Sequence, residues 1–153
     1  MKRLQPTIVG VIGAGQADEA LAATAREVGR LIAGQGWLLV CGGLGGVMAA
    51  AAEGASMAGG ITIGILPQGD RQAADPHIQI PIATGFGEGR NVIICRTADL
   101  LIAVGGEYGT LSEIAFALKL GKPVIGLGSW GIPGMIPVAD PAAAIAEAKS
   151  LLP

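Results

Sequence analysis

The chain has 153 residues, of which 51% are hydrophobic and only 14% are charged, and its formal net charge is -2. This length suits one domain, residues 1–153, with a core of its own. A slightly acidic chain without a basic cluster lacks the charge that binding to a nucleic-acid backbone requires, so we expect no nucleic-acid partner. Because about 25% of an ordinary soluble domain is charged, we also expect copies of the chain to cover apolar surface in a homodimer or homotetramer.

The first half of the chain alternates runs typical of strands with runs typical of helices. Residues 7–15 form a β-branched run that ends in turn glycines, as in a strand buried on both faces. Residues 18–33 then place apolar side chains at helical spacing. A second strand over 37–41, an alanine-rich helix that reaches about Ala58, and a third strand over 61–67 follow. That helix is small on all sides, which allows close helix contact between subunits.

The second half begins with residues 68–79, the longest polar stretch, which we expect to be an exposed loop. This loop holds the only histidine, His77, which has no evident partner in the sequence. Asp140 at the N-cap and Pro141 at the first helical position begin the last predicted helix. The elements between the loop and that helix are predicted to be a strand at 80–85, a helix at 87–97, a strand at 99–106, a helix at 110–120 and a strand at 123–128.

This alternation predicts a single-domain α/β fold, a Rossmann-like doubly wound parallel sheet with helices on both faces. In such sheets ligands bind at the carboxyl ends of the strands. Three glycine turns are expected at that edge, at residues 13–15, 42–46 and 105–109.

Several ligand classes lack their usual residues. In "GAGQAD" Asp18 replaces the small third residue of a dinucleotide fingerprint, and the second strand ends at Cys41 without an acid for the ribose, so we expect neither NAD nor FAD. The only "GK", at Gly121, precedes a proline, which excludes a P-loop. None of the four lysines lies in a turn at the predicted site, so pyridoxal phosphate is not expected either.

The cysteines and the glycines indicate the cellular compartment that we expect for this protein. Cys41 and Cys95 lie in apolar runs without a second ligand spaced for a metal, so we predict buried, reduced thiols and no metal site. Paired glycines interrupt every apolar stretch of about 18 residues, so we expect no membrane segment. We therefore expect a cytoplasmic protein.

The turns at 42–46 and 105–109 both lead from a strand into a helix. Backbone N–H groups and helix dipoles would then converge, and glycines let a phosphate approach the backbone closely. The alternative is that these glycines only shape tight turns.

Two charged residues near these turns have alternative roles. Thr110 and Glu113 fit the capping box S/T-x-x-E, which spacing alone slightly favours, whereas Glu113 could instead contact a ribose or act as a general acid or base. Arg90 could contact a phosphate, or it could form a surface ion pair with Glu88 or Asp99.

Several motifs, taken together, resemble the SLOG superfamily of Rossmann-like nucleotide-binding proteins, and most of all its branch of molybdenum cofactor carrier proteins. The motifs span about residues 7–127 and include "CGGLGGVMAAAAEGA", "TGFGEGRNVII" and "VGGEYGTLSEIAFALKLGKPVIGL". The resemblance implies a carrier of a phosphorylated nucleotide-like or pterin cofactor.

Another branch of the superfamily comprises the cytokinin-activating phosphoribohydrolases, often mislabelled as lysine decarboxylases. Their mark is PGGxGTxxE with an upstream Arg-Lys pair. Arg90, Gly109, Thr110 and Glu113 match this pattern, and in that branch the Arg and the Glu support cleavage of an N-glycosidic bond.

Three residues depart from it: Gly105 stands at the Pro, Glu107 at a Gly and Asn91 at the Lys. Losing the Lys and adding a carboxylate both weaken phosphate binding, although a carboxylate suits the N–H donors of a pterin.

We therefore predict a binding protein for molybdenum cofactor or a nucleotide. The alternatives are a nucleoside-5′-monophosphate phosphoribohydrolase with Arg90 and Glu113 as catalytic residues, and an assembly scaffold. The predicted binding residues are Gly13, Gly15, Gly42, Gly43, Gly45, Gly46, Arg90, Asn91, Gly105, Gly106, Glu107, Gly109 and Thr110.

Overall fold

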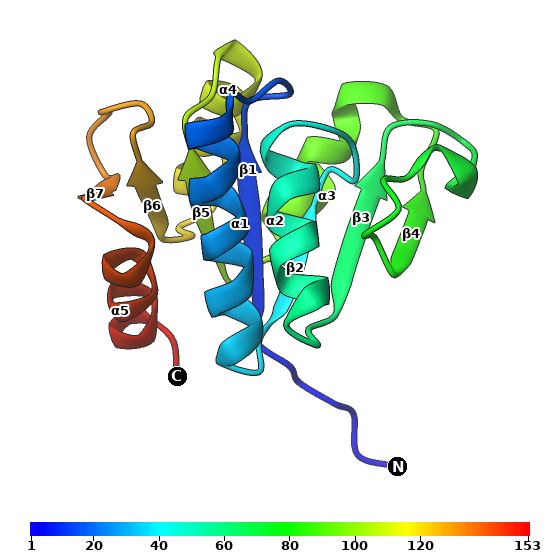
Figure 1. Ribbon diagram of the computed structural model, residues 1–153, viewed down its shortest axis with the longest axis horizontal. Coiled ribbons are helices and arrows are strands. Elements are labelled where there is room, and N and C mark those ends of the chain that lie inside the picture. Colours follow the sequence, from blue (N-terminus) through cyan, green and yellow to red (C-terminus); the bar gives the residue numbers. More distant parts are fainter.

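We describe a computed structural model that covers residues 1–153 (Figure 1). The strands are β1 (Ile8–Gly13), β2 (Leu38–Cys41), β3 (Thr62–Leu66), β4 (Ile80–Ala83), β5 (Leu100–Val104), β6 (Val124–Leu127) and β7 (Ile136–Val138). The helices are α1 (Glu19–Gly34), α2 (Val47–Met57), α3 (Arg90–Thr97), α4 (Tyr108–Lys119) and α5 (Pro141–Leu151), with short 3-10 turns η1 (Arg71–Ala73) and η2 (Gly87–Gly89).

The seven strands form one sheet in the order β4-β3-β2-β1-β5-β6-β7. Every neighbouring pair is parallel. In Figure 1 all strands accordingly point toward the same edge of the sheet. The predicted Rossmann-like, doubly wound α/β fold is confirmed.

The central strands of the sheet are buried on both faces. Alternate residues along β1, β2 and β5 pack on the side of α1, α2 and α5 in one apolar cluster, and the others pack on the side of α3 and α4 in a second cluster. Figure 1 shows α1, α2 and α5 in front of the sheet and α3 and α4 behind it. The central strands read as continuous apolar runs because neither of their faces meets solvent.

The small residues of α2 serve contacts within the chain. A Cβ added at Gly29 of α1 would lie 1.9 Å from the Ala51 carbonyl oxygen, and a Cβ at Gly54 of α2 would lie 1.9 Å from the Arg26 carbonyl oxygen. The two helix backbones therefore touch, and α2 buries its alanines against α1 and the sheet. The structure thus gives the small face of α2 a partner inside the subunit.

Local sequence patterns correctly predicted where α1 and α5 begin. Asp18 caps α1 by accepting from the Leu21 N–H at 2.8 Å, and Asp140 caps α5 by accepting from the Ala143 N–H at 2.8 Å. Strand β7 was not predicted, because it has three residues and Pro137 at its centre. None of the helices has both the length and the apolar character needed to cross a membrane.

Candidate functional site

The loops that follow β1, β2 and β5 meet at one edge of the sheet, because these strands are parallel neighbours. The chain leaves β1 toward α1 on one face of the sheet and leaves β5 toward α4 on the other face. The carboxyl ends of β1 and β5 therefore form a topological switch point, where open α/β sheets bind ligands.

A cavity of about 250 Å³ opens at this switch point. We call it the Arg90 cavity. It is lined by Val11, Ile12, Gly13, Gly15, Gly42, Met48, Glu88, Arg90, Asn91, Gly109 and Glu113. It thus brings residues of β1, of the first turn of α2, of α3 and of α4 into one small volume.

Arg90 is buried in this cavity, with only 8% of its surface exposed. Its Nη1 donates to Asn91 Oδ1 at 2.7 Å, whereas its buried Nε has no hydrogen-bond partner. Burial lowers the pKa of the guanidinium, and the nearby charge of Glu113 opposes this effect. The chain thus buries a cation and leaves one of its donors free.

The surface ion pair of Arg90 with Glu88 or Asp99, which the sequence allowed, does not form. The arginine–glutamate ion pairs of the chain join Arg26 to Glu53 and Arg30 to Glu27, and Asp99 accepts from the Ile8 N–H.

Two glycines shape the cavity through the absence of a side chain. A Cβ at Gly42 would lie 2.8 Å from Arg90 Nη2 and 2.6 Å from Met48 Sδ. A Cβ at Gly13 would lie 2.3 Å from the Val104 carbonyl oxygen. Gly42 therefore makes room for the guanidinium, and Gly13 allows β1 and β5 to pair up to their ends.

Glu113 faces Arg90 from α4, and the prediction of a capping box formed by Thr110 and Glu113 is wrong. Helix α4 begins at Tyr108 with Glu107 at the N-cap and no side-chain cap, so Thr110 lies inside the first turn, where it is buried. Glu113 instead lines the Arg90 cavity. Burial raises the pKa of its carboxyl from 4.5 to about 7, although Arg90 lowers it in part. A carboxyl with such a pKa exchanges a proton near neutral pH, as general acids and bases do.

The backbone N–H groups of the glycine loops have no backbone carbonyl as a partner, although the Gly43 N–H contacts the Cys41 thiol. Over residues 42–46 and 106–110, no backbone N–H donates to a backbone carbonyl. Two flanking N–H groups are occupied, since Val47 donates to the Ala14 carbonyl and Gly105 donates to the Leu127 carbonyl. Free N–H groups at helix N-termini are the groups that bind anions.

Six of the predicted binding residues line the Arg90 cavity: Gly13, Gly15, Gly42, Arg90, Asn91 and Gly109. Gly46 lines a neighbouring cavity instead. The remaining predicted residues line neither of these cavities: Gly43, Gly45, Gly105, Gly106, Glu107 and Thr110. Glu107 is exposed, and its carbonyl accepts from Trp130 Nε1 at 3.0 Å. Its carboxylate is therefore not part of the Arg90 cavity.

The structure adds four lining residues that the prediction had not included: Val11, Ile12, Met48 and Glu88. Only Glu88, two residues before Arg90, carried a sequence signal. Val11 and Ile12 in β1 and Met48 in α2 have no distinguishing feature in the sequence. Only the fold places them at this edge of the sheet.

Two further cavities adjoin the Arg90 cavity. One, of about 280 Å³, shares Glu88, Asn91, Gly109 and Glu113 with it and extends to Phe116; we call it the Phe116 cavity. The other, of about 570 Å³, shares Gly15 and lies beside His77; we call it the His77 cavity.

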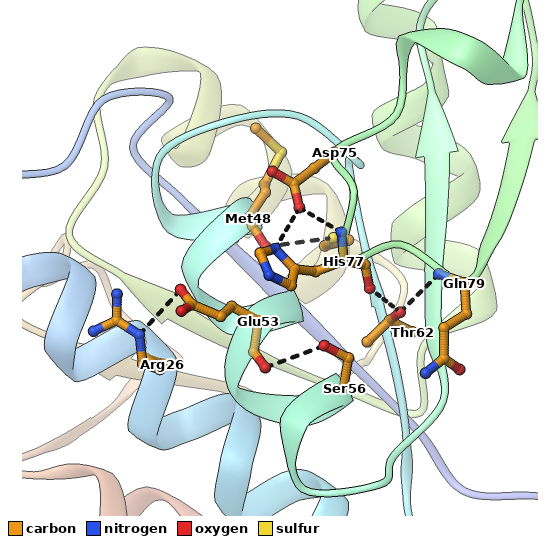
Figure 2. A network of polar contacts seen from close by, with 9 residues as sticks. Arg26, Met48, Glu53, Ser56, Thr62, Asp75, His77 and Gln79 are labelled. Carbon is orange, nitrogen blue, oxygen red and sulfur yellow. Dashed lines mark hydrogen bonds and ion pairs between the residues drawn. The ribbon is translucent and has the colours of Figure 1, made fainter.

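His77 has a partner that the sequence did not suggest. Its Nδ1 lies 3.0 Å from Asp75 Oδ1, within the 68–79 loop (Figure 2). The loop is exposed over most of its length but buries Ile78. No three His, Cys, Asp or Glu side chains lie close enough together to hold a metal ion.

The two cysteines are buried free thiols, as predicted. Burial raises the pKa of both Cys41 and Cys95 to about 12. Neither supplies a thiolate near neutral pH.

Residues 6–150 match the model of the SLOG cluster4 family. The chain belongs to this family. The SLOG cluster4 chain superposes on the molybdenum cofactor binding protein from Rippkaea orientalis with a TM-score of 0.92 and 37% identity, over 97% of this chain and 99% of that one. It superposes on the molybdenum cofactor carrier protein from Chlamydomonas reinhardtii with a TM-score of 0.89 and 39% identity, over 96% and 98% of the two chains.

Two curated relatives are similar in sequence. An uncharacterized protein from Archaeoglobus fulgidus is 51% identical over 127 residues, which is 83% of this chain and 82% of that protein. A cytokinin riboside 5′-monophosphate phosphoribohydrolase from Mycobacterium tuberculosis is 38% identical over 117 residues, which is 70% of this chain and 62% of the enzyme. The resemblance to the carrier branch of the SLOG superfamily is confirmed.

Proposed function

We propose that this SLOG cluster4 protein binds a small phosphorylated ligand of nucleotide or pterin type and holds it as cargo. The observation that carries the proposal is Arg90, a buried guanidinium whose Nε has no partner, in a cavity at the switch point of the sheet. An isolated buried charge is costly, whereas an oxyanion would supply both the opposite charge and the missing acceptor.

The surroundings of Arg90 support an anion rather than a neutral ligand. The N–H groups of residues 42–46 and 106–110 are free of backbone carbonyls, and Gly42 and Gly109 line the same cavity. Glu113 would oppose an anion when ionised, but its pKa of about 7 allows it to stay protonated in part and to donate a hydrogen bond.

Molybdenum cofactor fits this set of donors as a cargo. Its phosphate would meet Arg90, the Asn91 side chain and the free amides of residues 42–46. Its pterin would occupy a cavity that adjoins the Arg90 cavity. The likeness to two molybdenum cofactor proteins over nearly the whole chain favours this cargo over other phosphorylated compounds.

The test is binding of molybdenum cofactor, followed by the fluorescence of its oxidised pterin. Wild type should retain the cofactor through gel filtration, and Arg90→Ala should lose it. Arg30→Ala is the matched control, because Arg30 is an exposed arginine of α1 that pairs with Glu27. Wild type that retains no cofactor, or Arg90→Ala that retains as much as Arg30→Ala, would contradict the proposal.

A phosphoribohydrolase is the second candidate, because Arg90 and Glu113 line the same cavity and a relative carries that enzyme name. Glu113 would serve as the proton donor or acceptor for the departing base, and Arg90 would hold the phosphate. Incubation with AMP should then release adenine and ribose 5-phosphate, and Glu113→Gln should abolish the release. Wild type that leaves AMP intact over hours would eliminate this activity for that substrate.

A further inference from the structure

The His77 cavity lies on the opposite side of Gly15 from the Arg90 cavity. It is formed by the loop after β1, by α1, by α2 and by the 68–79 loop. Its lining includes small side chains, among them Ala22, Ala49 and Ala50. The polar side chains of the lining include Glu53, Asp75 and His77, which we call the rim. Small side chains beside polar groups leave both room and hydrogen-bond partners for a heterocycle.

The rim of this cavity is rich in hydrogen-bond acceptors. Asp75 Oδ1 accepts from both the backbone N–H and the Nδ1 of His77, at 2.9 and 3.0 Å, which leaves Asp75 Oδ2 without a bond. Glu53 binds Arg26 Nε through Oε2 at 3.1 Å, which leaves Glu53 Oε1 free. In the neutral imidazole, a proton on Nδ1 makes His77 Nε2 an acceptor as well.

Figure 2 shows the imidazole of His77 between Asp75 and the side of α2 that carries Glu53. Two acceptors from the 68–79 loop and one from α2 thus line one cavity. The only cation that lines it, Arg26, is already paired with Glu53.

This rim is fixed in place before any ligand arrives. The Asp75 N–H donates to the Gly43 carbonyl at 2.9 Å, which ties the loop to the glycine turn after β2. On the other side of His77, Thr62 Oγ1 donates to the His77 carbonyl at 2.6 Å and accepts from the Gln79 N–H at 3.0 Å. Rigid acceptors distinguish ligands by the donors that they present.

We propose that the His77 cavity recognises the 2-amino-4-oxo heterocycle shared by pterin and guanine, whose adjacent amino and ring N–H groups are donors. This inference rests on the proposed function, since the phosphate of the same ligand lies in the Arg90 cavity. Adenine offers an amino group next to a ring acceptor, and hypoxanthine lacks the 2-amino group, so both satisfy fewer of the rim acceptors. The Phe116 cavity is smaller and closer to Glu113, and it takes no part in reading the ring.

The experiment is titration calorimetry with GMP, IMP and inorganic phosphate. GMP and IMP differ only in the 2-amino group, so their affinity ratio isolates that donor. Wild type should bind GMP about tenfold more tightly than IMP, because an acceptor that the bound ring covers without offering it a donor costs about that much. Asp75→Asn and Glu53→Gln keep the shape of the side chain but turn a free acceptor into a donor. Each should bring the ratio close to one and leave phosphate affinity unchanged.

Glu27→Gln is the control, because Glu27 lies on α1 outside the three cavities and should keep the wild-type ratio. Equal affinity of wild type for GMP and IMP would overturn the inference, as would a tenfold ratio that survives in both Asp75→Asn and Glu53→Gln. If Asp75→Asn does not fold, Glu53→Gln decides alone. Loss of the proposed function has a different signature: wild type would then bind neither phosphate nor GMP.

Discussion

Glu113 should make the stability of the protein fall as the pH rises through neutrality. Burial raises the pKa of this carboxyl from 4.5 to about 7 in the folded state, whereas the unfolded chain has the ordinary value. The folded state therefore holds the proton more tightly, and the stabilisation is complete below pH 4.5 and lost above about pH 7. At roughly 1.4 kcal/mol for each pH unit, the difference between the two pKa values corresponds to about 3 kcal/mol.

The assay is urea unfolding of wild type and Glu113→Gln from pH 4.5 to about pH 8. Glutamine has nearly the same shape and no proton to lose, so the other titrating groups cancel in the comparison. The stability of wild type relative to the variant should fall by about 3 kcal/mol across this range. A difference that stays constant with pH would refute the reasoning, because it would mean that Glu113 keeps an ordinary pKa in the folded protein.

Three further outcomes follow from individual residues. Gly42→Ala should reduce affinity for phosphate by about tenfold or more, because its Cβ would displace the buried guanidinium; Gly34→Ala, whose Cβ would meet nothing within 4 Å, is the control in calorimetry. Gly29→Ala should lower the free energy of unfolding by about 2 kcal/mol or more in urea titrations, because its Cβ would overlap the backbone of α2, and Gly34→Ala should not. Cys41 and Cys95 should resist iodoacetamide at pH 8 in the folded protein and react in urea, as followed by mass spectrometry, because burial raises their pKa to about 12; modification at the unfolded rate would contradict that burial.

The sequence predicted the sheet well because its central strands are buried on both faces and read as uninterrupted apolar runs. It predicted the N-cap Asp140 for a different reason: this cap bonds an N–H three residues away, so the signal is local. Thr110 and Glu113 have the same local spacing, but the capping box that this spacing predicts does not form. Helix α4 starts earlier, at Tyr108, and Glu113 is turned toward the cavity by the packing of α4 on the sheet.

The rest of the site depends on contacts between distant segments. Arg90 is buried only because Gly42, far away in the chain, has no side chain to exclude it. The pairing of His77 with Asp75 is close in sequence, but the loop that fixes it is anchored on Gly43 and Thr62. The spacing of residues along the sequence does not reveal contacts between distant segments. The sequence therefore suggested that Arg90 lies at a phosphate site but did not predict that it is buried.

The position of a bound phosphate tests the central claim most directly. In a crystal of the protein grown with GMP, the phosphorus should lie in the Arg90 cavity, with its oxygens bonded to Arg90 Nε and to backbone amides of residues 42–46. A phosphate bound at the edge of the sheet away from Arg90, with the guanidinium Nε still unpartnered, would contradict the account.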